Sequence, residues 1–218
     1  RNLRRLFDEW VFASGYPQFE LSYNWHEDKK TAEIVIEQKQ THGLPVLVKD
    51  GLTTSIFHLP VVIELTLEGG KKQAHRFEVG EIKERVFIQA PSRPLMVRFD
   101  PNAWIPKTLK FPRPKEMLIY QLENDVDCMG RIEAAKELSK EAGKVTDGEI
   151  IRALARAVKS DSFWGVQAEV AAVLAEIRTP ACRDALIAAA GDPNAKARRA
   201  VIKALGNFRD DESARVIE

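Results

Sequence analysis

The periodicity of the apolar residues changes once along this chain, at a proline-rich segment from Pro94 to Phe111. Before the segment, apolar and polar residues alternate with a period of two, the pattern of half-buried strands. After it, Ala, Leu, Glu and Arg recur at helical spacing. The prolines of the segment neither donate to a ladder of hydrogen bonds nor continue a helix. The sequence therefore predicts a β module, an extended connection and an α module.

The chain opens on an amphipathic helix. One face of this helix carries Leu3, Leu6, Phe7, Trp10 and Val11, at the spacing i, i+3, i+4, i+7 and i+8. Gly15 stands where a left-handed cap ends a helix, and Pro17 prevents its continuation. The chain starts inside this helix, at an Arg, and stops at residue 218 as another helix begins. We therefore expect a fragment of a longer protein, with residues 1–15 as the terminal helix of a missing upstream domain.

Residues 16–106 are predicted to form an antiparallel β-sandwich of about six short strands. The last strand ends at Asp100-Pro101. We expect Gly69-Gly70 to form a tight hairpin, because both positions accept a positive φ. Residues 41–55 contain two glycines and a proline and are expected to form a loop.

Residues 107–218 are predicted to form HEAT-like α-helical repeats that are truncated at residue 218. The motifs that begin at Asp125, Asp161 and Asp192 align with offsets of 161 − 125 = 36 and 192 − 161 = 31 residues. This register makes three sets of positions equivalent: Arg131, Gln167 and Arg198; Ala134, Val170 and Val201; Leu138, Leu174 and Leu205. Second helices are expected over residues 150–158 and 185–189. Thr179-Pro180 and Asp192-Pro193 each fit an N-cap followed by proline at the first helical position.

The composition gives no reason to expect a nucleic-acid or membrane partner. Lys+Arg 33 against Asp+Glu 32 leaves a formal net charge of +1, and no apolar run is long enough to span a membrane. Cys128 and Cys182 fall in helical stretches and form no CxxC motif. We interpret them as buried free thiols, which suits a cytoplasmic location.

We assign no catalytic, cofactor-binding or metal-binding residue in this chain. The four histidines, His26, His42, His58 and His75, lie in separate segments without metal-ligand spacing. Four further groups have both a functional and a structural interpretation, and for each we prefer the structural one. They are Asp125 and Asp127 (cation site or turn), Lys196, Arg198 and Arg199 (nucleic-acid contact or surface), Tyr23 and Trp25 (sugar platform or core), and Glu133 and Glu169 (concave peptide-binding surface or solvated helix face).

The order of the modules resembles the C-terminal part of the aminopeptidase N-type zinc metallopeptidases, a gluzincin family. The residues that carry the resemblance are Phe7, Trp10, Val11, Gly15, Tyr16 and Pro17, residues 36–40, residues 59–63, Val97 to Pro101 with Trp104, and residues 125–138. The resemblance implies the end of a catalytic domain, a β-sandwich and part of a helical domain. It also implies partners: the upstream catalytic domain of the same polypeptide and the peptides on which it acts.

The family's catalytic motifs are missing from this chain. Members hold zinc with HExxH on one helix and a Glu on a following helix, and the first Glu acts as base on the bound water. The closest approach here begins at His26 and places Lys30 where the second His belongs. The family's GxMEN loop and catalytic Tyr are also absent. We therefore expect zinc only in the missing catalytic domain, and no catalysis by this chain alone.

Three hypotheses follow. In the first, the chain is a scaffold that spaces and covers the chamber of a zinc aminopeptidase and limits peptide access. In the second, it is a protein-binding scaffold from an aminopeptidase-like protein that has lost its metal, as in the related subunit of a general transcription factor. In the third, it is a free-standing adaptor, which predicts that Leu3, Phe7 and Trp10 pack wholly within this chain.

Overall fold

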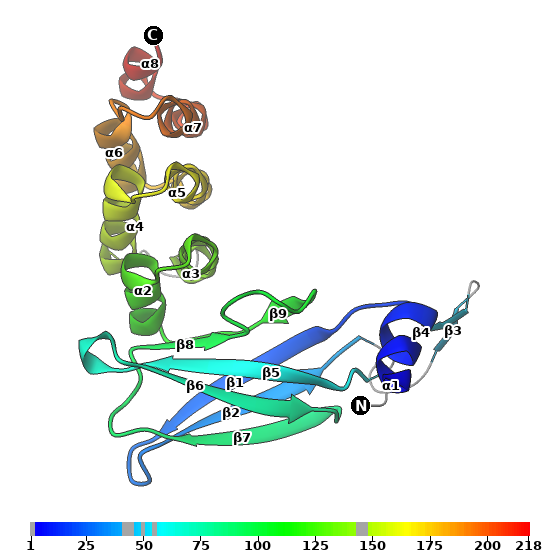
Figure 1. Cartoon of the computed structure of the whole chain (residues 1–218). Helices are drawn as coiled ribbons and strands as arrows, with labels where there is room; N and C mark the ends of the chain where they lie inside the picture. Colours follow the sequence, from blue (N-terminus) through cyan, green and yellow to red (C-terminus); the bar gives the residue numbers. More distant parts are fainter. Residues whose placement is uncertain (1–2, 41–45, 49–50, 54–55, 143–147) are drawn as a thin grey trace. The chain divides into compact units, whose positions relative to one another are not determined.

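The computed structural model describes residues 3–40, 46–48, 51–53, 56–142 and 148–218. The chain divides into two compact units, Arg1–Arg113 and Pro114–Glu218. The first unit contains the strands and the second contains helices α2 to α8 (Figure 1). The predicted order of a β module followed by an α module is therefore confirmed. The division falls after residue 113 rather than after residue 106, because Thr108–Lys110 form a strand of the first unit.

The first unit opens on a short helix, α1 (Arg4–Phe7), which continues as a π-helical turn, η1 (Asp8–Phe12). The helix ends at Phe12, since Ala13 is already extended, and Gly15 follows with a φ of 110°. Trp10 packs edge to face against Phe57, with ring centroids 4.7 Å apart. One side of the helix is thereby held on the β unit.

Four strands form the first sheet, in the order β7-β2-β1-β9. Their bounds are β1 (Gln18–His26), β2 (Thr31–Gln38), β7 (Lys83–Gln89) and β9 (Thr108–Lys110). The pairs β1–β2 and β2–β7 are antiparallel, as predicted, whereas β1 and β9 are parallel. The parallel strand β9 lies beyond residue 106, outside the range predicted to be antiparallel. The turn after β8 brings the chain back beside the start of β1, where the N–H of Thr108 donates to the carbonyl of Pro17 at 3.1 Å.

Three strands form the second sheet, in the order β6-β5-β8. Their bounds are β5 (Leu59–Thr66), β6 (Lys72–Val79) and β8 (Met96–Phe99). The 3₁₀ turn η2 (Glu68–Gly70) joins β5 to β6. Gly69 and Gly70 have φ angles of 72° and 75°, which confirms the predicted hairpin.

A separate two-stranded sheet lies where the sequence predicted a loop. β3 (Val46–Val48) and β4 (Gly51–Thr53) are antiparallel, so the loop prediction is wrong for these six residues. β-branched side chains at residues 46, 48 and 53 favour strands, which explains the difference. The described part of the chain therefore has nine strands rather than about six.

The core of the first unit comes from the alternating apolar residues of both sheets. Leu21, Ile34 and Ile36 of the first sheet and Val61, Ile63 and Leu65 of the second are almost fully buried. Phe19 of β1 contacts Phe99 of β8 edge to face, with ring centroids 5.2 Å apart. This contact joins the two sheets.

The second unit is built from helices in two layers (Figure 1). One layer contains α2 (Lys115–Asn124), α4 (Gly148–Ser160), α6 (Pro180–Ala189) and α8 (Asp211–Ile217). The other contains α3 (Cys128–Ala142), α5 (Trp164–Ile177) and α7 (Ala195–Leu205). The predicted second helices are α4 and α6. Their apolar faces meet those of α5 and α7 in one core that includes Leu138, Leu154, Leu174 and Leu205.

Side chains from one helix pair reach the turn of the next pair. Arg131 of α3 binds Asp161, and Gln167 of α5 donates from Nε2 to Asp192 Oδ2 at 2.7 Å. Thr179 caps α6 as predicted, accepting from the N–H of Cys182. The predicted cap at Asp192 is wrong, because α7 begins at Ala195 and Asn194 is its N-cap. Asp192 instead accepts from the N–H of Asn194 and from Gln167.

Candidate functional site

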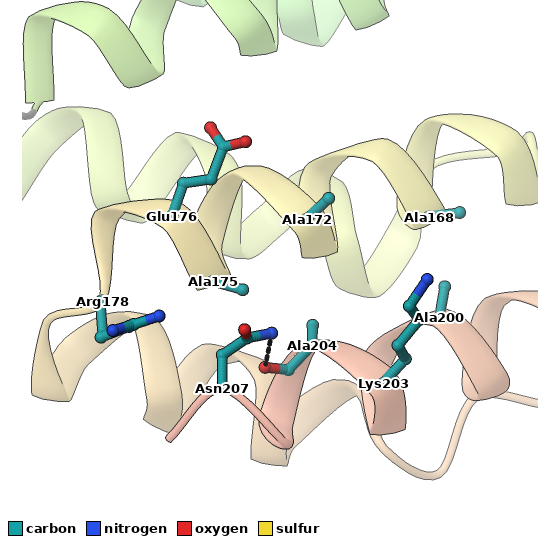
Figure 2. Close-up of a pocket in the computed structure, with 9 residues that line it drawn as sticks. All are labelled: Ala168, Ala172, Ala175, Glu176, Arg178, Ala200, Lys203, Ala204 and Asn207. Atoms are coloured by element: carbon teal, nitrogen blue, oxygen red, sulfur yellow. Dashed lines mark hydrogen bonds between the residues drawn. The ribbon is translucent and has the colours of Figure 1, made fainter. Parts of the chain in front are cut away.

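A groove of about 400 Å³ lies between α5 and α7 in the second unit (Figure 2). Its floor is made of five alanines: Ala168, Ala172 and Ala175 of α5, and Ala200 and Ala204 of α7. These residues recur at three- and four-residue spacing, so each set lies on one helix face. Because a methyl group is the only side chain at each of these positions, this part of the lining is apolar.

Four polar side chains border the groove: Glu176, Arg178, Lys203 and Asn207. Asn207 donates from Nδ2 to the carbonyl of Ala204 at 3.2 Å, which fixes its amide at the end of α7. Within the part of the chain that the structure describes, the side chains of Glu176, Arg178 and Lys203 form no ion pair. The border therefore carries two cations and one carboxylate.

The position of Arg178 is set by the end of α5. Its N–H donates to the carbonyl of Leu174 at 3.1 Å, and its φ and ψ of 55° and 40° are left-handed. This conformation favours glycine and costs other residues about 1–2 kcal/mol. An arginine at this position is therefore less stable than a glycine would be. Figure 2 shows the side chain of Arg178 directed along the groove toward Asn207.

The described histidines lie apart, as their sequence positions suggested. His26 contacts Glu33 (Nε2–Oε2 2.8 Å), His58 contacts Glu9 (Nδ1–Oε1 2.7 Å), and His75 stacks on Phe77. His42 lies outside the described residues. Across the described ranges, no three His, Cys, Asp or Glu side chains gather as metal ligands would.

The four groups with two interpretations have structural partners. Asp125 Oδ1 accepts from the N–H of Asp127, and Asp127 Oδ1 accepts from the N–H of Met129, as in a turn that leads into a helix. Glu169 pairs with Lys136 at 2.8 Å. Glu133 is half-buried on the preceding repeat. Neither glutamate lines the groove.

The basic cluster and the aromatic pair are also explained by local contacts. Lys196 Nζ lies 4.5 Å from the centre of the Trp164 ring, and Arg198 donates to the carbonyl of Asp192 at 2.7 Å. Arg199 is exposed. Tyr23 is half-buried, and burial raises the pKa of its hydroxyl. Trp25 is also half-buried, and its indole N–H donates to Glu27.

Sequence reasoning did not identify the groove. The signal was present as alanines at the same helical spacing on two successive inner helices, with an arginine at the end of the first. Alanine at such positions is also what close helix packing requires, so the pattern alone does not separate a groove from a filled contact.

A family model of HEAT repeats matches residues 151–218, which include α5, α6, α7 and the groove. Among solved structures, the crystal structure of aminopeptidase A from Legionella pneumophila in complex with aspartic acid matches with a TM-score of 0.58 and 15% sequence identity. The match covers 97% of this chain and 26% of that chain. This likeness shows an aminopeptidase-like fold. No curated protein matches the chain.

None of the described helices is long and apolar enough to cross a bilayer.

Proposed function

We propose that this chain is the non-catalytic part of an aminopeptidase-like protein, with a helical unit that contacts peptides. The observation that carries the proposal is the fold shared with one aminopeptidase across 97% of this chain. In this proposal the two sheets form a β-sandwich that spaces the domains. The helices form a HEAT-like solenoid that covers the peptidase chamber and limits peptide access.

The upstream catalytic domain is the proposed partner of α1 and η1. Leu3 and Phe7 are 55% and 44% exposed, and Val11 and Phe12 are more exposed still. A cluster of this kind on a short amphipathic helix favours burial against another domain. The free-standing adaptor hypothesis required Leu3, Phe7 and Trp10 to pack wholly within this chain. Leu3 and Phe7 are exposed, and Trp10 is half-buried with its ring against Phe57.

Zinc belongs to the upstream domain in this proposal, because this sequence contains no HExxH motif. The role left to this chain is to bind and exclude peptides. A cytoplasmic, reducing setting suits Cys128 and Cys182, which are both free thiols.

The groove supports a contact with a peptide carboxylate. Its alanine floor accommodates an extended backbone, while Arg178 and Lys203 provide positive charge at the border. An arginine donates two parallel hydrogen bonds to a carboxylate, and a lysine adds a point charge. Glu176 leaves the border with one net positive charge, so a peptide with a free C-terminal carboxylate is preferred to its amide.

Titration of this chain with a fluorescent nonapeptide, as the free acid and as the C-terminal amide, tests the contact. The free acid is expected to bind about tenfold more tightly, since a charged hydrogen bond contributes ~1.5–3 kcal/mol before screening by solvent. Lys203→Ala should reduce this preference, because it removes one of the two positive charges at the border. Lys159→Ala, which alters an exposed lysine of α4 outside the groove, should leave it unchanged. Equal affinity for acid and amide contradicts the proposed contact.

A further inference from the structure

The groove between α5 and α7 has a contact between its two helices at one end. Trp164 lies on α5, one turn before Ala168 of the floor. Lys196 lies on α7, one turn before Ala200 of the floor. The Nζ of Lys196 is 4.5 Å from the centre of the Trp164 ring, which is the geometry of a cation–π contact. An ammonium group is therefore placed at the end of the groove opposite Arg178.

A second aromatic ring supports the ring that Lys196 contacts. Trp164 is half-buried, and the centre of the Phe163 ring lies 5.6 Å from the centre of its ring. Lys196 is exposed, and within the part of the chain that the structure describes it forms no ion pair. The ring therefore orients the ammonium, while the positive charge stays available to a carboxylate of another molecule.

Helix α7 brings several positive charges to the groove and no negative charge. Four of its residues are basic and none is acidic: Lys196, Arg198, Arg199 and Lys203. Lys196 and Lys203 are seven residues apart, which is two helical turns, so they lie on the same face as Ala200. Among the described residues that line the groove, Glu176 alone carries a carboxylate. The charge of the groove therefore complements an acidic ligand.

The length of the groove matches a short extended peptide. Trp164 and Ala175, the last alanine of the floor on α5, are 175 − 164 = 11 residues apart. At ~1.5 Å per helical residue they are separated by about 16 Å, which an extended peptide spans with about five residues. A peptide that places its C-terminal carboxylate beside Arg178 therefore has its fifth preceding residue near Lys196.

We propose that the groove recognises peptides with an acidic side chain about five residues before the C-terminal carboxylate, and that Lys196 binds this side chain. The inference rests on the proposed contact of the peptide C-terminus with Arg178 and Lys203, and it adds a second anchor at the other end. Trp164 is a positioning residue, because its ring holds the ammonium that receives the carboxylate.

A nucleic-acid strand fits this surface less well than an acidic peptide does. The alanine floor has no ring on which bases can stack, and Lys196 already covers one face of the Trp164 ring. Glu176 repels a continuous phosphate backbone, whereas a peptide with two separate carboxylates can pass it with a neutral residue. The formal net charge of +1 also gives little long-range attraction to a polyanion.

The test uses two nonapeptides that carry Glu or Gln at the fifth residue before the C-terminus. Both have neutral residues elsewhere, a free C-terminal carboxylate and a fluorophore at the N-terminus. The Glu peptide is expected to bind this chain about three- to fivefold more tightly, the effect of an exposed ion pair, and the difference should shrink as salt is added. Lys196→Met should abolish the difference, whereas Lys159→Met, an exposed lysine of α4 outside the groove, should not.

Two substitutions of Trp164 test its positioning role. Trp164→Phe keeps an aromatic face under the ammonium and should retain part of the preference for Glu over Gln. Trp164→Leu removes this face and should lose more of the preference. Neither change should alter the preference for a free acid over an amide, because that preference depends on the other end of the groove. Equal loss in the two variants contradicts the positioning role.

The outcomes separate this inference from the proposed function. A chain that prefers the free acid to the amide but binds the Glu and Gln peptides equally excludes the second anchor and leaves the C-terminal contact in place. Equal affinity for acid, amide, Glu and Gln peptides excludes both. A Glu preference that survives Lys196→Met overturns the inference. So does an oligothymidylate that displaces the Glu peptide at a lower concentration than the unlabelled peptide does, since the ligand is then a nucleic acid.

Discussion

Arg131 and Asp161, thirty residues apart, form a two-armed ion pair in which Nε lies 2.7 Å from Oδ2 and Nη2 lies 2.9 Å from Oδ1. Both side chains are nearly buried, at 10% and 7% exposed. The carboxylate in turn raises the pKa of the guanidinium, so the arginine is charged at every accessible pH. This pair fixes the spacing between two successive helix pairs.

Removing the carboxylate of this pair should be costly. Asp161→Ala leaves a buried cation without a counter-ion, for which we expect a loss of ~3–5 kcal/mol in the free energy of unfolding. Urea denaturation followed by far-UV circular dichroism measures the change. Arg198→Ala is the control, because Arg198 is the exposed equivalent of Arg131. A loss there as large as that of Asp161→Ala contradicts this interpretation.

Asp100 organises the turn between β8 and β9, and its substitutions should lower the stability by different amounts. It has a φ of 50° and accepts from the N–H groups of Trp104 and Ile105, at 3.1 and 3.0 Å. It also binds Lys107, whose side chain is only 10% exposed. Asp100→Ala should cost ~3–5 kcal/mol, because it leaves Lys107 buried and unpaired.

Asp100→Asn should cost less than the alanine change, since asparagine keeps one oxygen that accepts from a backbone N–H and tolerates a positive φ. Denaturant midpoints of the two variants give the order. Asp28→Ala, in the exposed turn between β1 and β2, is the control. An alanine variant as stable as the asparagine variant is inconsistent with the role assigned to the carboxylate.

Two substitutions of Arg178 should differ in their effect on thermal stability but not in their effect on peptide binding. Arg178→Gly and Arg178→Ala both remove the guanidinium from the groove, but only glycine relieves the left-handed backbone. We expect the glycine variant to be more stable than the alanine variant by ~1 kcal/mol. Both should lose the preference for a free peptide carboxylate to the same extent. Thermal denaturation and peptide titration of the two variants check these outcomes together.

Glu33 should contribute to the acid sensitivity of the β unit. Its hydrogen bond with His26 lowers the pKa of its carboxyl, with a further contribution from Arg85, although burial opposes the shift. Because the pKa is lower in the folded state, the stabilisation is present above the ordinary value of 4.5 and is lost as the pH falls through the folded-state pKa. Glu33→Gln should therefore flatten the acid side of the stability profile.

Urea midpoints measured at a series of pH values from neutral to below 4.5 test this expectation. Glu68→Gln, on the exposed connection between β5 and β6, is the control and should keep the acid side of the wild-type profile. A Glu33→Gln profile that is as steep as the wild-type profile excludes this carboxyl as a major contributor.

The repeat register was predictable because it depends on local spacing. The offsets of 36 and 31 residues made Arg131, Gln167 and Arg198 equivalent before any contact was known, and the first two have equivalent bonds. The capping residue of α7 was predicted wrongly, since an aspartate before a proline satisfies the same pattern as the asparagine two residues later. The sequence alone does not show that the carboxylate of Asp192 accepts a hydrogen bond from Gln167.

Other features depend on contacts between distant segments. β9 has only three residues and lies between Pro106 and Pro112, and its parallel pairing with β1 follows from the turn held by Asp100. The groove depends on the separation of α5 and α7, which alanine spacing does not define. The alternation of Phe19, Leu21, Ile34 and Ile36, by contrast, placed the core of the first sheet correctly, because a period of two leaves one buried face.

We propose that this chain is part of an aminopeptidase without performing its chemistry. The most direct test compares this chain with a longer protein that also contains the upstream domain. Bound zinc per molecule and the rate of hydrolysis of an aminoacyl-anilide are measured for both proteins. We predict about one zinc per molecule and turnover in the longer protein, and neither in this chain alone. A longer protein with neither zinc nor turnover contradicts the claim and favours the metal-free protein-binding scaffold.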